Sequence, residues 1–194
     1  MTTGDFTEIA LVDDAIVDRT YESAGEESAI WSVVGTLADL PRLATDYPAF
    51  LAACGDSELR LRWLNEAQAL GYLLPVLIHP SATVSTHASL GEGTVVTAGA
   101  VINFGARLGR GCIVNTGATV DHDCELGHGV HVCPGAHLAG EVRVGDRSWL
   151  GIGAVIRQQI TVGANAVVGA GAVCVSDVDE GSMVTGVPAK EHSR

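Results

Sequence analysis

The sequence is poor in aromatic residues and in positive charge. Aromatic side chains make up 5% of the chain, although 47% of its residues are hydrophobic. Lysine and arginine together number 11 against 23 aspartates and glutamates, so the formal net charge is −12. This balance argues against a nucleic acid or an anionic membrane surface as a partner. An anionic cofactor would have to be bound by local basic side chains or by backbone N–H groups.

Segments that would direct the chain to a membrane are also lacking. No apolar run approaches the ~20 residues of a membrane span. The opening residues, MTTGDFTEIALVDD, contain no basic segment followed by an apolar one, so we expect no signal peptide. The five cysteines are odd in number and form no CxxC pair, a usage typical of a reducing compartment. We therefore expect a cytoplasmic protein.

What dominates the sequence is a repeat of six residues. Sixteen consecutive positions hold one phase without an insertion, and fifteen of them are aliphatic. A period of six matches neither an α-helix nor a simple strand, and it is typical of a hexapeptide β-helix. The positions are Val84, Leu90, Val96, Ile102, Leu108, Val114, Val120, Leu126, Val132, Leu138, Val144, Leu150, Ile156, Val162, Val168 and Cys174.

Each hexapeptide is expected to supply one short strand and one corner of a triangular prism. Three repeats complete a coil, so residues three repeats apart stack on one another. The aliphatic residue points into a prism too narrow for large rings, which explains the scarcity of aromatic residues. Cys112, Cys124 and Cys174 also occupy inward positions, where they act as small buried hydrophobic residues.

The first 79 residues lack this repeat and predict a small α/β domain with a parallel sheet. A helix is expected from Glu58 to about Leu70, capped by Ser57 and ended by Gly71. Before it, Pro41 should limit a helical stretch to its first turn. Strands are expected at 8–14, 30–34, 49–54 and 72–78, and an exposed loop at 15–30.

A nucleotide-binding fold of this kind normally opens with a strand and a Gly-rich turn. Neither precedes Glu8, so we expect a Rossmann-like domain that lacks its first strand and turn. The predicted organisation is this truncated α/β domain at 1–79, a β-helix domain at 80–178 and a C-terminal tail at 179–194.

The repeat and the tail sequence GVPAK resemble the left-handed β-helix acyltransferases that use acetyl-CoA. The stretch NTGATVDHDCELGHGVHVCPGAHLAG, residues 115–140, is similar to the core of the sugar O/N-acetyltransferase family. That family includes N-acetyltransferases of nucleotide-linked 4-amino sugars and sialic-acid O-acetyltransferases. The resemblance implies a left-handed parallel β-helix, a homotrimer, and acetyl-CoA bound between two prisms with no metal. Its expected substrate is the 4-amino group of a nucleotide-linked deoxyamino sugar.

The resemblance also assigns roles to individual residues. His122 matches the catalytic base and Asp123 the acidic residue that raises its basicity, although family members often carry glutamate there. Gly140 would offer its backbone N–H to the thioester oxygen. A histidine is a suitable base near neutral pH. The spacing of the repeat independently supports a common site for His122 and Gly140, because it places both residues on one corner of successive coils.

Further matched positions are expected to bind the two substrates. The cofactor-binding positions are Asn115, His131, Gly140, Ile152, Ala170 and Lys190. The positions of the sugar-nucleotide pocket are Asp13, Asp14 and Gly55.

Two other classes of function stay open from the sequence. One is a trimeric scaffold without catalytic activity. The other is a zinc enzyme like the γ-class carbonic anhydrases, suggested by the density of histidines at 122, 128, 131 and 137. Against zinc, residues six apart lie on different faces of the prism. Within the resembled family, O-acetylation of a sugar is the alternative to N-acetylation.

Overall fold

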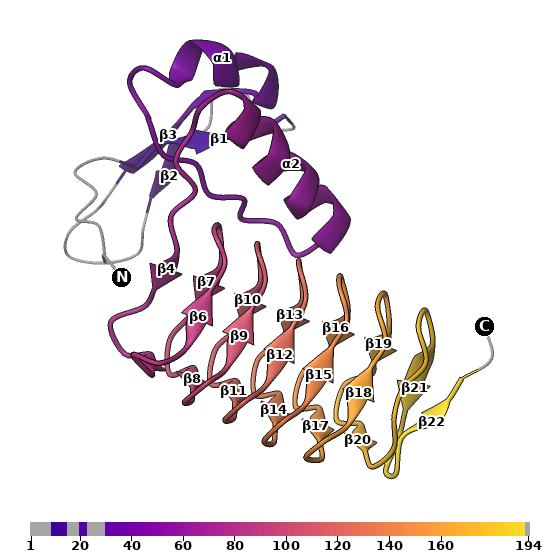
Figure 1. The fold of residues 1–194 in the computed structure, drawn as a ribbon. Coiled ribbons are helices and arrows are strands. Elements are labelled where there is room, and N and C mark those ends of the chain that lie inside the picture. Colours follow the sequence, from indigo (N-terminus) through magenta and orange to yellow (C-terminus); the bar gives the residue numbers. More distant parts are fainter. Residues whose placement is uncertain (1–8, 15–19, 23–29, 193–194) are drawn as a thin grey trace.

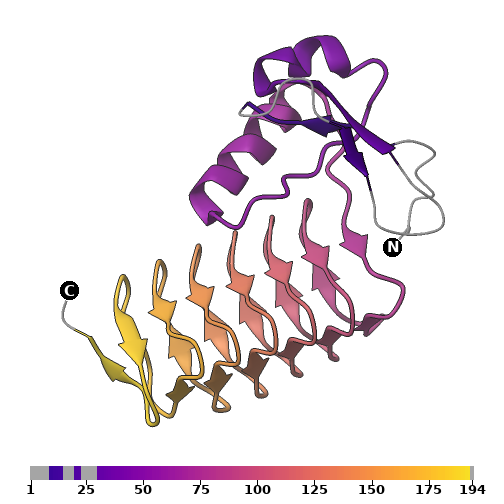
Figure 2. The same cartoon turned by 180° about the vertical axis from the view of Figure 1, so that it is seen from behind.

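The computed structural model describes residues 9–14, 20–22 and 30–192, and it consists of a small N-terminal α/β part and a long triangular β-helix (Figure 1). The N-terminal part lies beside the first coils, and the chain ends at the opposite end of the β-helix (Figures 1 and 2). No helix in the described part of the chain is long and apolar enough to span a membrane.

The β-helix is built from three sheets whose strands pair in parallel, apart from one antiparallel pair at its C-terminal end. The six-stranded sheet has the order β20 (Val173–Cys174), β17 (Val155–Ile156), β14 (His137–Leu138), β11 (Thr119–Val120), β8 (Val101–Ile102) and β5 (Thr83–Val84). The five-stranded sheet has the order β18 (Thr161–Val162), β15 (Arg143–Val144), β12 (Glu125–Leu126), β9 (Arg107–Leu108) and β6 (Ser89–Leu90).

The eight-stranded sheet forms the third face. Its order is β22 (Lys190–Glu191), β21 (Met183–Thr185), β19 (Val167–Val168), β16 (Trp149–Leu150), β13 (His131–Val132), β10 (Ile113–Val114), β7 (Val95–Val96) and β4 (Leu77–Ile78). Because β4 pairs with β7, the β-helix begins at Leu77, before the start that we expected at residue 80.

The register confirms the predicted coil. Val114 pairs with Val132 and Val120 pairs with Leu138, so every residue lies opposite the one three repeats later. Side chains alternate between the two faces of a strand, and the second residue of each strand fills the prism. The predicted inward positions from Val96 to Cys174 are at most 5% exposed, and Cys112 and Cys124 are completely buried.

Three rows of turns connect the sheets, and we name them by chain order within a coil. The first corner joins the eight- to the six-stranded sheet, the second joins the six- to the five-stranded sheet, and the third returns to the eight-stranded sheet. Several turns need a left-handed backbone, which glycine adopts without strain. At the second corner Asp123 takes this conformation, with φ of 57°.

The N-terminal sheet is smaller than its sequence suggests. It contains β1 (Leu11–Val12), β3 (Ile30–Gly35) and β2 (Thr20–Glu22) in the order β1-β3-β2. β1 and β3 are parallel, as expected, but β2 is antiparallel to β3 and lies inside the segment that we expected to be a loop. The predicted strand at 49–54 is wrong: Ala49 forms only a single bridge with Leu73.

The helices also differ in detail from the expectation. Pro41 does not end a helix but lies in the first turn of α1 (Leu40–Leu43), after the short 3₁₀ helix η1 (Leu37–Asp39). A proline is tolerated there because its missing N–H has no partner within the helix. Helix α2 (Ser57–Ala69) is capped by Asp56 instead of Ser57, because the Asp56 Oδ1 accepts the Leu59 N–H at 2.8 Å.

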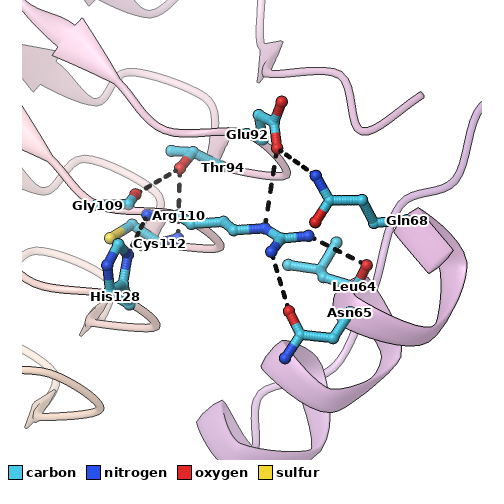
Figure 3. A network of polar contacts seen from close by, with 9 residues as sticks. All are labelled: Leu64, Asn65, Gln68, Glu92, Thr94, Gly109, Arg110, Cys112 and His128. Carbon is cyan, nitrogen blue, oxygen red and sulfur yellow. Dashed lines mark hydrogen bonds and ion pairs between the residues drawn. The ribbon is translucent and has the colours of Figure 1, made fainter. Parts of the chain in front are cut away.

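Helix α2 lies along the third corner of the first coils (Figures 1 and 2). Leu64 is fully buried there, and a Cβ atom at Gly93 or Gly111 would lie 2.7 or 2.8 Å from its methyl carbons. Glycine at these turns therefore permits both the left-handed backbone and the close approach of the helix. Hydrogen bonds from Arg110, on the third corner, to the Leu64 carbonyl and the Asn65 side chain add to this contact (Figure 3).

Candidate active site

His122 lies on the second corner, between β11 and β12, with its side chain about half exposed. Its Nδ1 is 2.9 Å from the Asp123 Oδ2. The His122 backbone N–H also donates to the Asp121 Oδ1, at 2.8 Å. With Nδ1 bonded to a carboxylate, Nε2 is the nitrogen left free to accept a proton.

The surroundings raise the pKa of His122. The largest cause is the hydrogen bond to Asp123, and the negative charges of Asp121, Asp123 and Glu141 act in the same direction. A carboxylate beside an imidazole stabilises the protonated ring. The corner therefore holds a histidine that is a stronger base than a free one.

Gly140 lies one coil further along the same corner. A Cβ atom at this position would be only 2.5 Å from His122 Nε2 and 2.6 Å from its Cε1, so the ring fits against the glycine because the side chain is missing. Within residues 9–14, 20–22 and 30–192, no acceptor bonds the Gly140 N–H. The corner therefore brings together a free base nitrogen and a free backbone donor, on the spacing that the repeat predicts.

Apart from Gly140, the expected cofactor positions do not join His122 within one chain. Asn115, Ile152 and Ala170 all lie on the first corner, between strands of the eight- and six-stranded sheets. Lys190 lies on β22 at the C-terminal end of the β-helix. The width of the six-stranded sheet separates the first corner from the second, so one chain carries the two halves of the predicted site apart.

His131 is buried, with 6% of its surface exposed, although it lies on the outer side of β13. Its ring packs against Trp149 with the centroids 4.3 Å apart, and its Nε2 is 3.2 Å from the Asn115 Nδ2. Burial and then the nearby charge of Arg60 lower the pKa of His131 to about 4. The imidazole is therefore neutral at physiological pH.

The sugar-pocket candidates lie in the N-terminal part. Asp14 Oδ1 accepts the Leu37 N–H at 2.8 Å, and the Asp13 N–H donates to the Gly35 carbonyl at 3.1 Å. Both aspartates thus lie where β1 and β3 end. Gly55 lies elsewhere, against Trp149: a Cβ atom there would be 3.9 Å from the Trp149 Cη2.

Two contacts at the site are not among the sequence-based expectations. Asn103 Nδ2 donates to the Asp121 Oδ1 at 2.8 Å, which supports the carboxylate beside His122. Trp149 covers His131. The members of each pair are separated by one coil, so the spacing of the repeat contains the signal for both contacts.

The four histidines considered for zinc point to different sides of the β-helix. His122 lies on the second corner, His128 on the third, His131 on the eight-stranded sheet and His137 on the six-stranded sheet. Among the residues that the structure describes, no group of three or more His, Cys, Asp or Glu side chains could hold a metal ion.

Comparison with known proteins finds relatives of this fold. The bacterial transferase hexapeptide model matches residues 141–175. The acetyltransferase domain of PglB from Neisseria gonorrhoeae, in complex with acetyl coenzyme A, has 46% identity and a TM-score of 0.88 over 96% of this chain and 87% of that one. PerB from Caulobacter crescentus, in complex with CoA and GDP-perosamine, has 43% identity and a TM-score of 0.83 over 84% and 79%.

A third solved structure, WeeI from Acinetobacter baumannii, shares the fold at 24% identity, with a TM-score of 0.81 over 94% of this chain and 85% of that one. Comparison with curated proteins gives no match. The fold and these similarities define a left-handed parallel β-helix acyltransferase of the hexapeptide class, as the sequence predicted. Within that class, the chain belongs to the nucleotide amino-sugar N-acetyltransferase family.

Proposed function

We propose that this chain transfers the acetyl group of acetyl-CoA to the 4-amino group of a nucleotide-linked deoxyamino sugar. The observation that carries the proposal is the second corner, where His122 Nε2 lies against Gly140, whose N–H has no acceptor in the described part of the chain. The relatives support the identity of both substrates: PglB is bound to acetyl-CoA, and PerB to CoA and GDP-perosamine.

The proposed reaction is a direct transfer without an acyl-enzyme. The sugar amine attacks the thioester carbonyl, and His122 Nε2 accepts the proton that the amine loses. The Gly140 N–H donates to the oxygen that becomes negative in the tetrahedral intermediate. The C–N bond then remains, the C–S bond breaks, and protonated His122 returns the proton to the departing CoA thiolate.

The charges around the base favour an amine over a hydroxyl as the acceptor. Asp121, Asp123 and Glu141 all act on His122 as negative charges. An amino sugar reaches the enzyme largely as an ammonium ion, which such a corner attracts, whereas a neutral hydroxyl gains nothing from it. The ammonium ion loses one proton to solvent before its nitrogen attacks, and His122 accepts the second proton, which the amine loses during the transfer. This supports N-acetylation, and no feature of the corner favours the O-acetylation alternative.

The separation of the two corners leads us to propose a homotrimer. In a threefold ring the same two surfaces of each subunit meet at every interface. The second corner of one subunit can then meet the first corner of its neighbour, which joins His122 to Asn115, Ile152 and Ala170. The exposed apolar side chains of Ile152, Trp149 and Val155, which are 62%, 37% and 39% exposed, are consistent with a surface covered in this way.

The remaining assignments complete the proposal. Asp13, Asp14 and Gly55 bind the sugar nucleotide from the N-terminal domain, taken as residues 1–79. His131 contributes to the acetyl-CoA groove, and Lys190, in the tail at 179–194, binds the nucleotide end of the cofactor. The cytoplasmic location stays a prediction.

The proposal is tested by a substrate screen. Purified protein is incubated with acetyl-CoA and a panel of 4-amino-4,6-dideoxy sugars linked to UDP, GDP or dTDP, and CoA release is followed with a thiol reagent. Each amino sugar is paired with the sugar nucleotide that carries a hydroxyl at the same carbon. We expect release with one amino member and none with its hydroxyl partner. Turnover of the hydroxyl partner alone would contradict N-acetylation.

A further inference from the structure

Arg60 is a completely buried arginine at the start of α2. Its Nε donates to the Gly111 carbonyl at 2.7 Å, and its Nη2 donates to the Gly129 carbonyl at 2.7 Å. Its Nη1 donates to the carbonyls of Cys54 and Gly55, at 2.7 and 3.0 Å. The guanidinium therefore joins the turn before α2 to the third corner at two successive coils.

All of these acceptors are neutral carbonyls. No carboxylate in the described part of the chain forms an ion pair with Arg60, and its remaining hydrogen bond is to the Ser57 hydroxyl, at 3.3 Å. A buried cation without a counter-ion is a costly way to attach a helix, because the desolvation of the charge must be offset by hydrogen bonds alone. The planar fork of donors does, however, fix the position of the carbonyls that it binds.

The turn that Arg60 holds reaches the eight-stranded sheet. Gly55, whose carbonyl bonds to Arg60, lies against Trp149, and Trp149 packs on His131. Arg60 also acts on His131 through its charge, which lowers the pKa of the imidazole in addition to burial. The same guanidinium is thus linked to a candidate residue of the sugar pocket and to one of the acetyl-CoA groove.

We propose that Arg60 is a positioning residue that sets the sugar-nucleotide pocket at a fixed place relative to the β-helix. It does so by holding the turn Cys54–Gly55 on the carbonyls of Gly111 and Gly129. This inference rests on the proposed function for the identity of the ligand. It assigns to Arg60 an effect on the binding of the sugar nucleotide, with acetyl-CoA binding left largely unchanged.

Arg110 offers a matched control, because it joins the same helix to the same corner without touching the turn (Figure 3). Its Nη1 donates to the Asn65 Oδ1 at 2.9 Å and its Nη2 to the Leu64 carbonyl at 3.1 Å. Its Nε is 4.0 Å from a Glu92 oxygen. Loss of Arg110 weakens the attachment of α2 but leaves the contacts of Cys54 and Gly55 in place.

The experiment compares Arg60→Met, Arg60→Lys and Arg110→Met with the wild-type protein, all as full chains. KM is measured separately for the amino-sugar nucleotide and for acetyl-CoA, with thermal midpoints recorded in parallel. We expect Arg60→Met to raise the KM of the sugar nucleotide about tenfold and to leave that of acetyl-CoA within about twofold. Arg60→Lys, with fewer donors, should give an intermediate value and serves if the methionine variant does not fold.

The control decides between positioning and stability. Arg110→Met should lower the thermal midpoint while the KM of the sugar nucleotide stays at the wild-type value. An equal rise of this KM in Arg60→Met and Arg110→Met, or no rise in any Arg60 variant, overturns the proposal.

A second readout does not depend on turnover. The pKa of His131, followed by NMR of the imidazole, should rise in Arg60→Met and stay unchanged in Arg110→Met. If the wild-type protein acetylates no amino sugar, the proposed function fails. The titration of His131 then still tests whether Arg60 acts on His131. An unchanged His131 in Arg60→Met would show that the guanidinium does not act on the groove.

Discussion

The first and second corners of the β-helix are built by the same repeat but offer different chemistry. The second carries charged groups, with His122 and Asp123 bonded to each other and Glu141 nearby. The first corner consists of neutral residues, among them Ile152, which is 62% exposed. The difference supports the proposal that one chain separates the group that reacts from the surface that receives the cofactor. The following variants test this division, starting with the largest expected effect.

Loss of the base should have the largest effect. We expect His122→Ala to lower kcat about 10³-fold, the range in which general bases contribute. The KM of acetyl-CoA should change little, because we propose that the first corner binds that substrate. The matched control is His128→Ala, on the third corner, which removes only the acceptor of the Arg110 backbone N–H and should keep normal turnover. Near-normal turnover of His122→Ala would contradict a catalytic role of the second corner.

A single methyl group at Gly140 should have the next largest effect. In Gly140→Ala the new Cβ would meet the ring of His122, so the base must move away from the reacting atoms. We expect kcat to fall about 10²-fold, as for the displacement of a catalytic group by about 1 Å. Gly181→Ala, where the φ of 69° causes strain but no atom lies within 4 Å, should lower stability only. Equal losses of activity in the two variants would point to a general destabilisation of the β-helix.

The pH dependence tests the role of Asp123. Neutral His122 is the active form, so the acidic limb of kcat/KM follows its pKa, which Asp123 raises. Asp123→Asn keeps a residue that tolerates the left-handed backbone but removes the charge. The pKa of His122 should then fall, the limb should move to lower pH, and the maximal rate should drop about tenfold. Asp146→Asn, on the third corner, should leave the limb in place. A limb that stays fixed in Asp123→Asn would contradict the assignment.

Mixed trimers test whether the two corners meet between subunits. Ile152→Glu should repel acetyl-CoA from the first corner, and His122→Ala inactivates the second, so each variant alone is inactive. When the two are co-expressed, about one quarter of the interfaces in a threefold ring combine two intact halves. We expect about that share of wild-type activity in the mixture. No recovery would place the whole site within one chain.

The two parts of the molecule differ in how much of them the sequence could predict. Each coil repeats the contacts of the previous one, so the period of the repeat alone is enough to pair Val114 with Val132. The N-terminal part has no such regularity. The apolar run at 49–54 predicts a strand, but it forms a single bridge at Ala49, because no strand in the described part of the chain runs beside it. Local composition cannot reveal whether a partner strand is present.

The same reason limits the prediction of the site. His122 and Gly140 could be placed together because the repeat itself brings them to one corner. The burial of His131 could be foreseen only in part. The repeat stacks Trp149 on it, but Gly55 reaches it from the N-terminal domain, which has no repeat. Arg60 is an ordinary helix residue in the sequence, and only the fold shows that it is buried among carbonyls.

The burial of the thiols has a practical consequence for measuring the enzyme. Burial raises the pKa of Cys112 to about 12 and the pKa values of Cys124 and Cys133 to about 11. It also raises the pKa of Cys174, and all four side chains are closed to solvent. Disulfide reagents that detect released CoA react with thiolates. These four side chains therefore do not react with the reagent at neutral pH and add nothing to the measured signal. Only half-buried Cys54 can compete with released coenzyme, and a Cys54→Ser chain should allow continuous assays with a negligible blank.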